Sequence, residues 1–260
     1  MEKTRKWALI LGGSSGLGWA TACKLAKHNF NLVIIHRTRK SEMPGVEQKF
    51  WELKSLGAEL VSFNKDAINK EVRQTLISEL KSNLKATGIS VLVHSIAKGN
   101  LKPMLGDANE SLAGMDFQIT IEAMGISLYD WVKELSIQGL FAKDARVISF
   151  TSEGNSKAWP YYAAVSAAKV TLEAITRGIA LEFAPHGIKA NCIQAGVTDT
   201  KSLRYIPNSD LIIKEALRRN PNRRLTTPED VANAAFLLTQ DEANWITGTI
   251  IKVDGGESLQ

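Results

Sequence analysis

A tyrosine and a lysine in the stretch AWPYYAAVSAAK, residues 158 to 169, are the side chains best suited to chemistry in this chain. Tyr162 lies seven residues before Lys169, and seven helical steps of about 100° fall about 20° short of two turns. Both side chains would then share one helix face. A phenol there can donate a hydrogen bond to an oxygen that gains negative charge, and the ammonium group adds positive charge. Tyr161 would point about 80° away and is the poorer donor.

A glycine-rich segment, LGGSSGLG, follows the apolar run KWALIL and precedes a helical pattern. Glycine lets the backbone adopt positive φ angles and approach a phosphate closely. The N-terminus of the following helix favours an anion. A tight turn alone would also use glycines, but strand, turn and helix agree in position. We therefore predict a dinucleotide site formed by Gly12, Ser14, Ser15, Gly16, Leu17 and Gly18.

The end of the second apolar run, IIHRTRK, bears on the choice of nucleotide. An acid there binds the ribose hydroxyls of NAD, whereas a cation accommodates the 2′-phosphate of NADP. No acid occurs before Glu42, and Arg37 is the best phosphate ligand, with Arg39 or Ser14 as helpers. These residues predict NADPH. Asp66, after the third run, could meet the adenine or cap a helix.

These residues sit in an alternation of apolar, β-rich runs and helical patterns, which is typical of βαβ units and a parallel sheet. We expect one α/β domain over residues 1–260, a doubly wound Rossmann-type fold with a seven-stranded parallel sheet. The strands are predicted at 6–11, 31–36, 59–64, 91–96, 146–151, 188–194 and 249–254. The tyrosine/lysine helix is predicted from about Tyr161 to Pro185, and Thr227 is predicted to cap a helix. Residues 198–224, where the pattern loosens, are predicted to form a mobile lid.

The net charge is +5, and basic residues concentrate between 201 and 224. They are Lys201, Arg204, Lys214, Arg218, Arg219, Arg223 and Arg224. A solvated face is one interpretation, and a docking surface for an acidic partner is the other. No stacking aromatics or binding motif accompany the charge, so we expect no nucleic-acid partner.

The composition, 44% hydrophobic and 23% charged, is that of an ordinary globular protein. No segment approaches the roughly 18 apolar residues of a membrane span. Cys23 and Cys192 have no zinc-ligand spacing, and the four histidines form no cluster with acids or cysteines, so we expect no metal site. Two unpaired cysteines suit a reducing compartment, and we expect the protein in the cytoplasm.

Five motifs together resemble the short-chain dehydrogenase/reductase family over essentially the whole chain: LGGSSGLG, KDA at 65 to 67, the tyrosine/lysine helix, NCIQAGVTDT and GTIIKVDGG. Most members place the tyrosine four residues before the lysine, where this chain has Val165. The spacing of seven is similar to that of bacterial enoyl-acyl-carrier-protein reductases. VHSIAKG at 93 to 99 resembles their nicotinamide segment, and residues 205–238 look most like the NADPH-using type III enzymes.

The resemblance implies cofactor contacts from Asp66, Ala67, Ser95, Ile96, Ala97, Lys169, Val197 and Thr200, and a substrate-side serine at Ser152. It implies a homotetramer and an acidic acyl carrier protein that docks on residues 201–224. It also implies reduction of a trans-2-enoyl thioester, with hydride added to the β-carbon while Tyr162 donates to the enolate oxygen. The α-carbon proton would come from Tyr162 or solvent.

Two other functions stay open: a 3-oxoacyl or other carbonyl reductase with Tyr162 or Tyr161 as donor, and a non-catalytic NADPH-binding regulator. One departure from the family concerns Glu122, which stands where many relatives carry asparagine. We expect a buried acid there to pair with Lys169 or to have a raised pKa.

Overall fold

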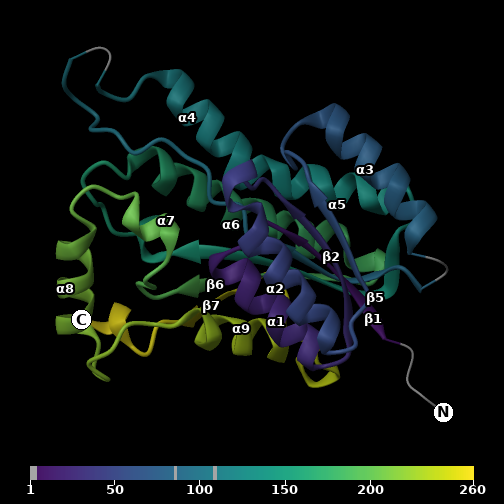
Figure 1. Ribbon diagram of the computed structural model, residues 1–260. Helices are drawn as coiled ribbons and strands as arrows, with labels where there is room; N and C mark the ends of the chain where they lie inside the picture. The colour runs from purple at the N-terminus through teal and green to yellow at the C-terminus, as the bar shows by residue number, and fades with distance from the viewer. Residues whose placement is uncertain (1–4, 85–86, 108–109) are drawn as a thin grey trace.

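A seven-stranded parallel sheet forms the centre of the computed structural model, which describes residues 5–84, 87–107 and 110–260 (Figure 1). The strands are β1 (Lys6–Leu11), β2 (Phe30–His36), β3 (Leu60–Asn64), β4 (Ile89–His94), β5 (Phe141–Ser152), β6 (Ile188–Ala195) and β7 (Ile250–Val253). Their order is β3-β2-β1-β4-β5-β6-β7, and each neighbouring pair is parallel. The predicted α/β class and the seven strands are confirmed. The strand order reverses between β1 and β4, which opens a crevice at their carboxyl ends.

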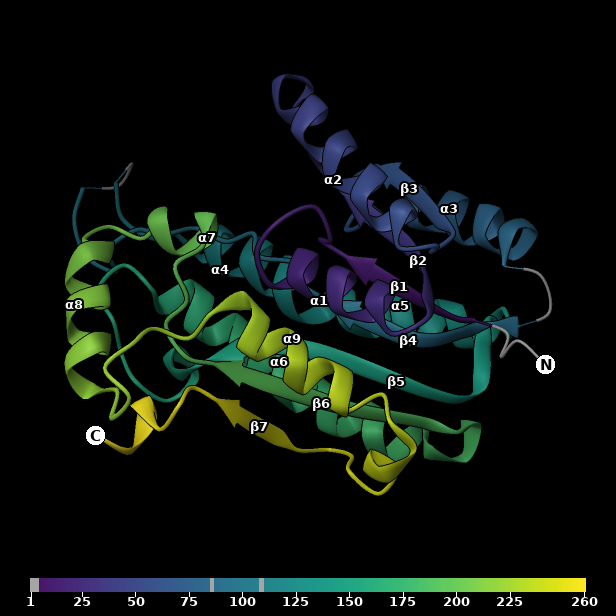
Figure 2. The same cartoon turned by 60° about the horizontal axis from the view of Figure 1, so that its bottom comes forward.

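Helices cover both faces of the sheet, so most residues of its central strands are buried (Figure 2). One face packs against α1 (Gly16–Lys27), α2 (Met43–Ser55) and α9 (Pro228–Leu237). The other packs against α3 (Lys70–Asn83), α5 (Ser127–Ile137) and α6 (Ala163–Glu182). Trp131 of α5 is fully buried, and its indole N–H donates to the Ala67 carbonyl at 2.9 Å. The described residues contain no helix both long and apolar enough to cross a bilayer.

The remaining helical segments lie mainly in connections. They are η1 (Lys40–Glu42), α4 (Gly114–Ile121), the π-helix η3 (Glu122–Ile126), η4 (Glu153–Asn155), η5 (Ala184–His186), α7 (Lys201–Arg204), α8 (Ser209–Arg219), η6 (Asp241–Ala243) and η7 (Glu257–Leu259). The α7 and α8 helices fill the segment predicted as a lid and lie beyond the carboxyl ends of the strands (Figure 2). Thr227 caps α9, as predicted, in a capping box with Asp230.

The start of α6 differs from the prediction. The helix covers Ala163 to Glu182, not 161 to 185, and Tyr162 is its N-cap residue with φ −109° and ψ 0°. Tyr161 adopts a positive φ of 66°. Placing Tyr162 within the helix was therefore wrong, because the chain turns sharply just before the first helical residue. The Tyr162 carbonyl still accepts the Ser166 N–H at 2.8 Å, which attaches the residue to the first turn.

Candidate active site

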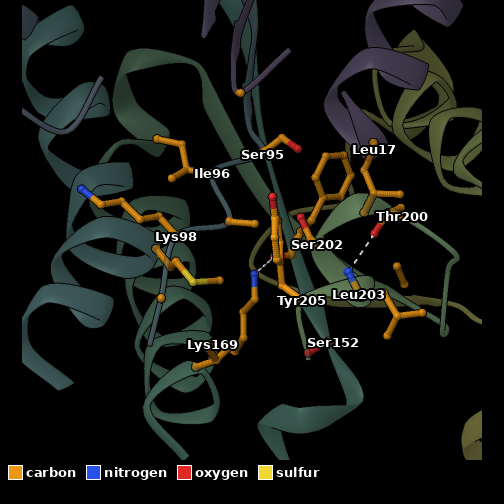
Figure 3. A pocket seen from close by; sticks show the side chains of 18 of the residues that line it. Leu17, Ser95, Ile96, Lys98, Ser152, Lys169, Thr200, Ser202, Leu203 and Tyr205 are labelled. Atoms are coloured by element: carbon orange, nitrogen blue, oxygen red, sulfur yellow. Dashed lines mark hydrogen bonds between the residues drawn. The ribbon is translucent and has the colours of Figure 1, made fainter. Parts of the chain in front are cut away.

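One cavity of about 610 Å³ lies at the carboxyl ends of the strands, and residues of α7 and α8 form part of its lining. Figure 3 shows part of this lining. Most residues singled out from the sequence line it: Gly12, Ser14, Ser15, Gly16, Leu17, Arg37, Asp66, Ala67, Ser95, Ile96, Ala97, Ser152, Tyr162, Lys169, Val197 and Thr200. Gly18 does not line it. Figure 3 shows Lys169 reaching into the cavity from one side, with Ser95 and Ile96 across from it.

Glycine geometry shapes the end of the cavity nearest β1. Gly12 has φ +85°, and a Cβ there would overlap the Ser95 carbonyl oxygen. A Cβ on Gly18 would overlap the Gly12 carbonyl oxygen and lie 3.0 Å from the Ser95 Cβ, so Gly18 serves the close packing of α1 behind the cavity. Ser15 is the N-cap residue of α1, but its side chain accepts no hydrogen bond from the helix. The N–H groups of the first turn therefore face this end of the cavity without a side-chain cap. This cradle fits a pyrophosphate.

Arg37 and Asp66 meet at the next part of the cavity. The Arg37 Nη1 atom lies 3.0 Å from Asp66 Oδ2, and the Arg37 side chain is 63% exposed. Asp66 Oδ1 accepts the Ile68 N–H at 3.0 Å, whereas Asn69 caps α3. Asp66 is therefore not the cap of that helix. A guanidinium group that lines the cavity has the donors and the charge to bind a 2′-phosphate.

Tyr162 and Ser152 face each other at the catalytic end. The Tyr162 hydroxyl lies 3.4 Å from Ser152 Oγ, the last residue of β5. Burial raises the pKa of Tyr162, so the phenol stays protonated and able to donate. Tyr161 is not among the lining residues, which favours Tyr162 as the donor.

Lys169 lies buried on α6 and also lines the cavity. Its Nζ donates to the Phe150 carbonyl at 2.7 Å. Burial lowers the pKa of Lys169 to about 8, although nearby Cys192 and Glu173 act to raise it. The amine can thus change charge close to neutral pH while it points at the cavity.

Two supports of this end were missed from the sequence. Glu173, one helical turn beyond Lys169, accepts hydrogen bonds from Thr151 Oγ1 at 2.5 Å and Asn155 Nδ2 at 2.6 Å, on both sides of Ser152. The feature of the sequence that could have indicated Glu173 is an acidic residue on a helix face that is otherwise apolar. Gly154 backs the tyrosine ring, because a Cβ there would lie 2.5 Å from Tyr162 Cε1.

The expectation for Glu122 is wrong. Glu122 is exposed where it begins the π-helix, and no ion pair joins it to buried Lys169. His94, at the end of β4, lies closer to the cavity and is buried. Its Nε2 is 2.8 Å from Ser127 Oγ, and burial, with Lys169 nearby, lowers its pKa to about 3. His94 is therefore neutral and does not exchange protons at ordinary pH.

Val197 and Thr200 follow β6 and have structural partners of their own. The Val197 N–H donates to Glu257 Oε2 at 3.1 Å. The group that Val197 could offer to a nicotinamide carboxamide is therefore its backbone carbonyl. Thr200 Oγ1 accepts the Leu203 N–H at 3.3 Å and caps α7. Glu257 was not predicted from the sequence, because its contact spans 60 residues.

Apolar side chains also line the cavity. Its lining includes Leu101, Met124, Trp159, Val165, Ile206 and Ile212. The last two come from the segment around α7 and α8, so the predicted lid forms one wall. An acyl chain fits such a surface.

The basic segment 201–224 is less cationic than its sequence indicates. Five of its seven basic residues are paired with carboxylates: Lys201 with Glu42, Arg204 with Asp199 and Asp210, Arg218 with Glu215, Arg219 with Glu153 and Glu257, and Arg224 with Asp230. Lys214 and Arg223 are exposed and make no ion pair with any described residue. Across residues 5–84, 87–107 and 110–260, no three His, Cys, Asp or Glu side chains gather as metal ligands.

Known proteins resemble this chain along almost its whole length. The pattern of the enoyl-(acyl carrier protein) reductase family matches residues 12–258. The enoyl-[acyl-carrier-protein] reductase [NADH] FabI of Buchnera aphidicola subsp. Baizongia pistaciae is 28% identical over 257 residues, 98% of this chain and 95% of the relative. The 1-cyclohexenylcarbonyl-CoA reductase of Streptomyces collinus is 25% identical over 98% of this chain and 88% of its own.

The solved structure of the enoyl-[acyl-carrier-protein] reductase (NADH) of Aquifex aeolicus VF5 superimposes with a TM-score of 0.83. The two are 26% identical, and the match covers 98% of this chain and 97% of that one. The chain therefore belongs to the enoyl-(acyl carrier protein) reductase family, a nicotinamide-dependent oxidoreductase family among the short-chain dehydrogenase/reductases.

Proposed function

We propose that this protein reduces trans-2-enoyl thioesters with NADPH, as an enoyl-acyl-carrier-protein reductase of fatty acid biosynthesis. The observation that carries the proposal is the position of the Tyr162 hydroxyl. It lies 3.4 Å from Ser152 Oγ in the cavity that Lys169 also lines, and the tyrosine packs against a cluster of apolar side chains. A hydrogen-bond donor there suits an oxygen several bonds away from the carbon that receives hydride.

Each residue has a role in this proposal. Bound NADPH would supply hydride to the β-carbon of the enoyl group. Tyr162, kept protonated by its raised pKa, donates a hydrogen bond to the thioester oxygen as it gains enolate character. Ser152 orients that phenol. Lys169 binds the nicotinamide ribose hydroxyls and adds positive charge while its amine is protonated.

The preference for NADPH rests on Arg37. The two relatives described above are named for NADH, so membership of their family does not by itself support NADPH. The sequence from the end of β2 has no acid before Glu42, and Arg37 lines the cavity. Asp66 now pairs with Arg37, and a 2′-phosphate would share that guanidinium.

The carrier and the assembly are part of the proposal. We infer that residues 198–224 close over the acyl chain and that an acyl carrier protein docks on this side through unpaired Lys214 and Arg223. The paired charges of the segment would contribute little to docking. A homotetramer is supported by the free edge of β7 and by apolar side chains exposed on α4, α5 and α6, such as Met115, Tyr129 and Val170.

The test follows NADPH absorbance with crotonyl thioesters and, separately, with acetoacetyl thioesters. We expect oxidation with the first. Oxidation only with the second would replace the proposal by a carbonyl reductase. Nucleotide binding without turnover of either thioester would favour the NADPH-binding regulator. Running NADH in parallel decides the nucleotide, and light scattering decides the assembly.

A further inference from the structure

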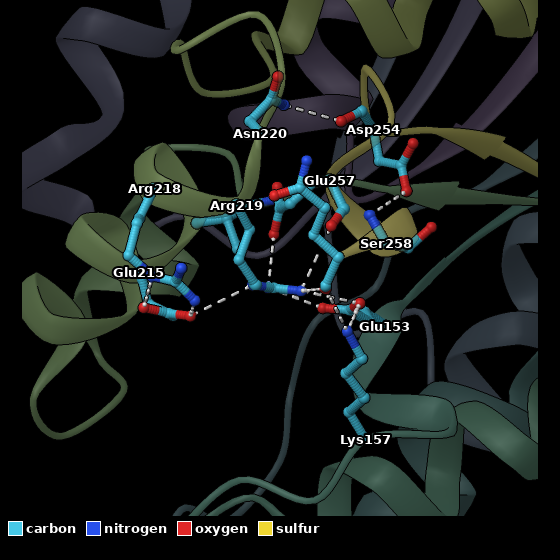
Figure 4. A network of polar contacts seen from close by, with 12 residues as sticks. Glu153, Lys157, Glu215, Arg218, Arg219, Asn220, Asp254, Glu257 and Ser258 are labelled. Carbon is cyan, nitrogen blue, oxygen red and sulfur yellow. Dashed lines mark hydrogen bonds and ion pairs between the residues drawn. The ribbon is translucent and has the colours of Figure 1, made fainter.

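Arg219, at the last turn of α8, is a buried arginine that the reaction itself does not require. It is 6% exposed and lies among carboxylates from two other segments (Figure 4). Its Nη1 and Nη2 atoms bind both oxygens of Glu153 at 3.1 and 2.9 Å. Nη2 also binds Glu257 Oε1 at 3.0 Å. A buried guanidinium with this fork geometry fixes its partners in one plane.

Glu153 and Glu257 are each connected to a residue that lines the cavity, the first through the chain and the second through a hydrogen bond. Glu153 follows Ser152 in the chain, and it also accepts Lys157 Nζ at 2.6 Å. Glu257 is 2% exposed, and its second oxygen accepts the Val197 N–H at 3.1 Å. Burial raises the pKa of Glu257 against the opposing effects of that N–H and of Arg219. The two carboxylates thus share one guanidinium, that of Arg219.

The end of α8 is fixed by neighbouring contacts as well. Asn220 Nδ2 donates to the Asp254 carbonyl at 2.9 Å, just after β7. The other end of the lid segment supplies cavity-lining residues, Tyr205, Ile206 and Ile212. The lid segment is therefore anchored at Arg219 and Asn220, whereas its cavity-facing part lies in α7 and the first turn of α8.

We propose that Arg219 is a positioning residue, which sets the relative positions of Ser152, the Val197 backbone and the lid helix α8 by holding Glu153 and Glu257 together. It acts through these carboxylates and touches neither nucleotide nor thioester. Its effect on the thioester rests on the proposed function, but its effect on nucleotide binding does not. Loss of the cation removes the guanidinium from buried Glu257 and leaves Glu153 paired with Lys157, so the two carboxylates are no longer held together and both loops shift.

The experiment compares Arg219→Gln with Arg218→Gln, a matched change at the neighbouring residue. Arg218 is on the same helix, but its side chain is 69% exposed and, among the described residues, forms an ion pair with Glu215 alone. We expect Arg219→Gln to weaken NADPH binding, measured by calorimetry, by about tenfold. The thioester kcat should fall by a similar factor, and Arg218→Gln should change neither by more than about twofold. Arg219→Lys keeps the positive charge but not the two-pronged hydrogen bonding of a guanidinium group, so its NADPH affinity and kcat should lie between those of the two glutamine variants.

A double-mutant cycle with Glu257→Gln separates positioning from mere stability. If Arg219 acts on Val197 through Glu257, the double variant binds NADPH no more weakly than Arg219→Gln alone. Additive losses overturn the proposal, and so does a lower melting temperature with unchanged NADPH affinity. If Arg219→Gln does not fold, the same double-mutant cycle can be measured with Arg219→Lys in its place. Inactivity of the unmutated protein on enoyl thioesters would refute the proposed function but leave the calorimetric comparison valid.

Discussion

The two ends of the cavity are built in different ways. At the nucleotide end, backbone geometry within a short stretch, from Gly12 to Gly18, makes space for a phosphate. At the other end, around Tyr162 and Ser152, side chains from distant segments hold one another; we call it the thioester end after the proposed substrate. Ser152 meets Tyr162, and Glu173 binds residues on both sides of Ser152. The first end is formed by local chain geometry, and the second depends on tertiary contacts.

This difference teaches where substitutions act. Changes at the nucleotide end should alter which nucleotide binds and how tightly, because they change the shape or charge of a preformed cradle. Changes at the thioester end should alter turnover more than nucleotide affinity, because they move the hydrogen-bond donor by fractions of an ångström. The five predictions below test this separation, from the largest expected effect to the smallest.

Tyr162→Phe should give the largest loss, confined to the thioester end. Removing the phenol that faces Ser152 takes away stabilisation of the enolate oxygen, and kcat should fall by about 300-fold. NADPH affinity should change by less than about twofold. Stopped-flow absorbance measures the first and calorimetry the second. Tyr161→Phe, one residue away and outside the cavity, should keep its activity; equal losses in both variants would refute the assignment.

Arg37→Asp should reverse the nucleotide preference without disabling the thioester end. A carboxylate there repels the 2′-phosphate and can accept from ribose hydroxyls, so the NADPH-to-NADH ratio of kcat/KM should fall by about 100-fold. Turnover with saturating NADH should persist. Lys40→Asp makes the same charge change at an exposed residue outside the cavity and should leave the ratio unaltered. An unchanged ratio in Arg37→Asp would remove the basis for NADPH.

Much of this architecture could be predicted from the sequence, and the reason is local geometry. The apolar runs predicted seven strands, and LGGSSGLG predicted the cradle, because both depend on residues adjacent in the chain. Thr227 as a helix cap was confirmed for the same reason.

The thioester end was harder to predict. The sequence predicted Tyr162 and Lys169 in one site, and both line the cavity, but it placed Tyr162 inside the helix, because nothing in PYYAAV reveals the positive φ of Tyr161. The expectation for Glu122 came from its position in relatives, and no local pattern shows that this side chain is exposed at the start of the π-helix. Glu257 and Arg219 act across 38 residues, and no local pattern shows such a pair.

Gly154→Ala should damage the thioester end by steric pressure alone. The added methyl group would lie 2.5 Å from Tyr162 Cε1, so the ring must shift. The Gly154 φ angle is not positive, so the backbone tolerates alanine. We expect kcat to fall by about tenfold with nucleotide affinity unchanged. Gly178→Ala, on α6 with open space around it, is the control and should be fully active. Equal activity of both variants would mean that the ring position does not matter.

The charge of Lys169 should link the two ends through pH. Because burial lowers its pKa to about 8, the amine loses its proton well below the usual range for lysine. NADPH affinity should therefore fall by about fivefold as pH rises from 7 to 9. The apo protein should show the opposite trend in stability, because between about pH 8 and 10.5 the unfolded chain binds more protons than the folded one. Calorimetry and thermal melting across this range measure both. In Lys169→Met the pH dependence of affinity should disappear, and its persistence would exclude Lys169 as the titrating group.

The smallest effect is expected at the outer surface of the lid, where charge rather than shape is tested. Lys214 and Arg223 are the exposed cations of the 201–224 segment without a carboxylate partner among the described residues. Replacing both by glutamate should raise KM for a crotonyl carrier protein by about threefold, because rim charges mainly affect association. KM for crotonyl-CoA should stay constant, and added salt should narrow the difference between variant and parent. Charge reversal at Arg218, already paired with Glu215, should have a weaker effect. Equal shifts with both thioesters would place the effect inside the cavity and remove this surface as the carrier's docking site.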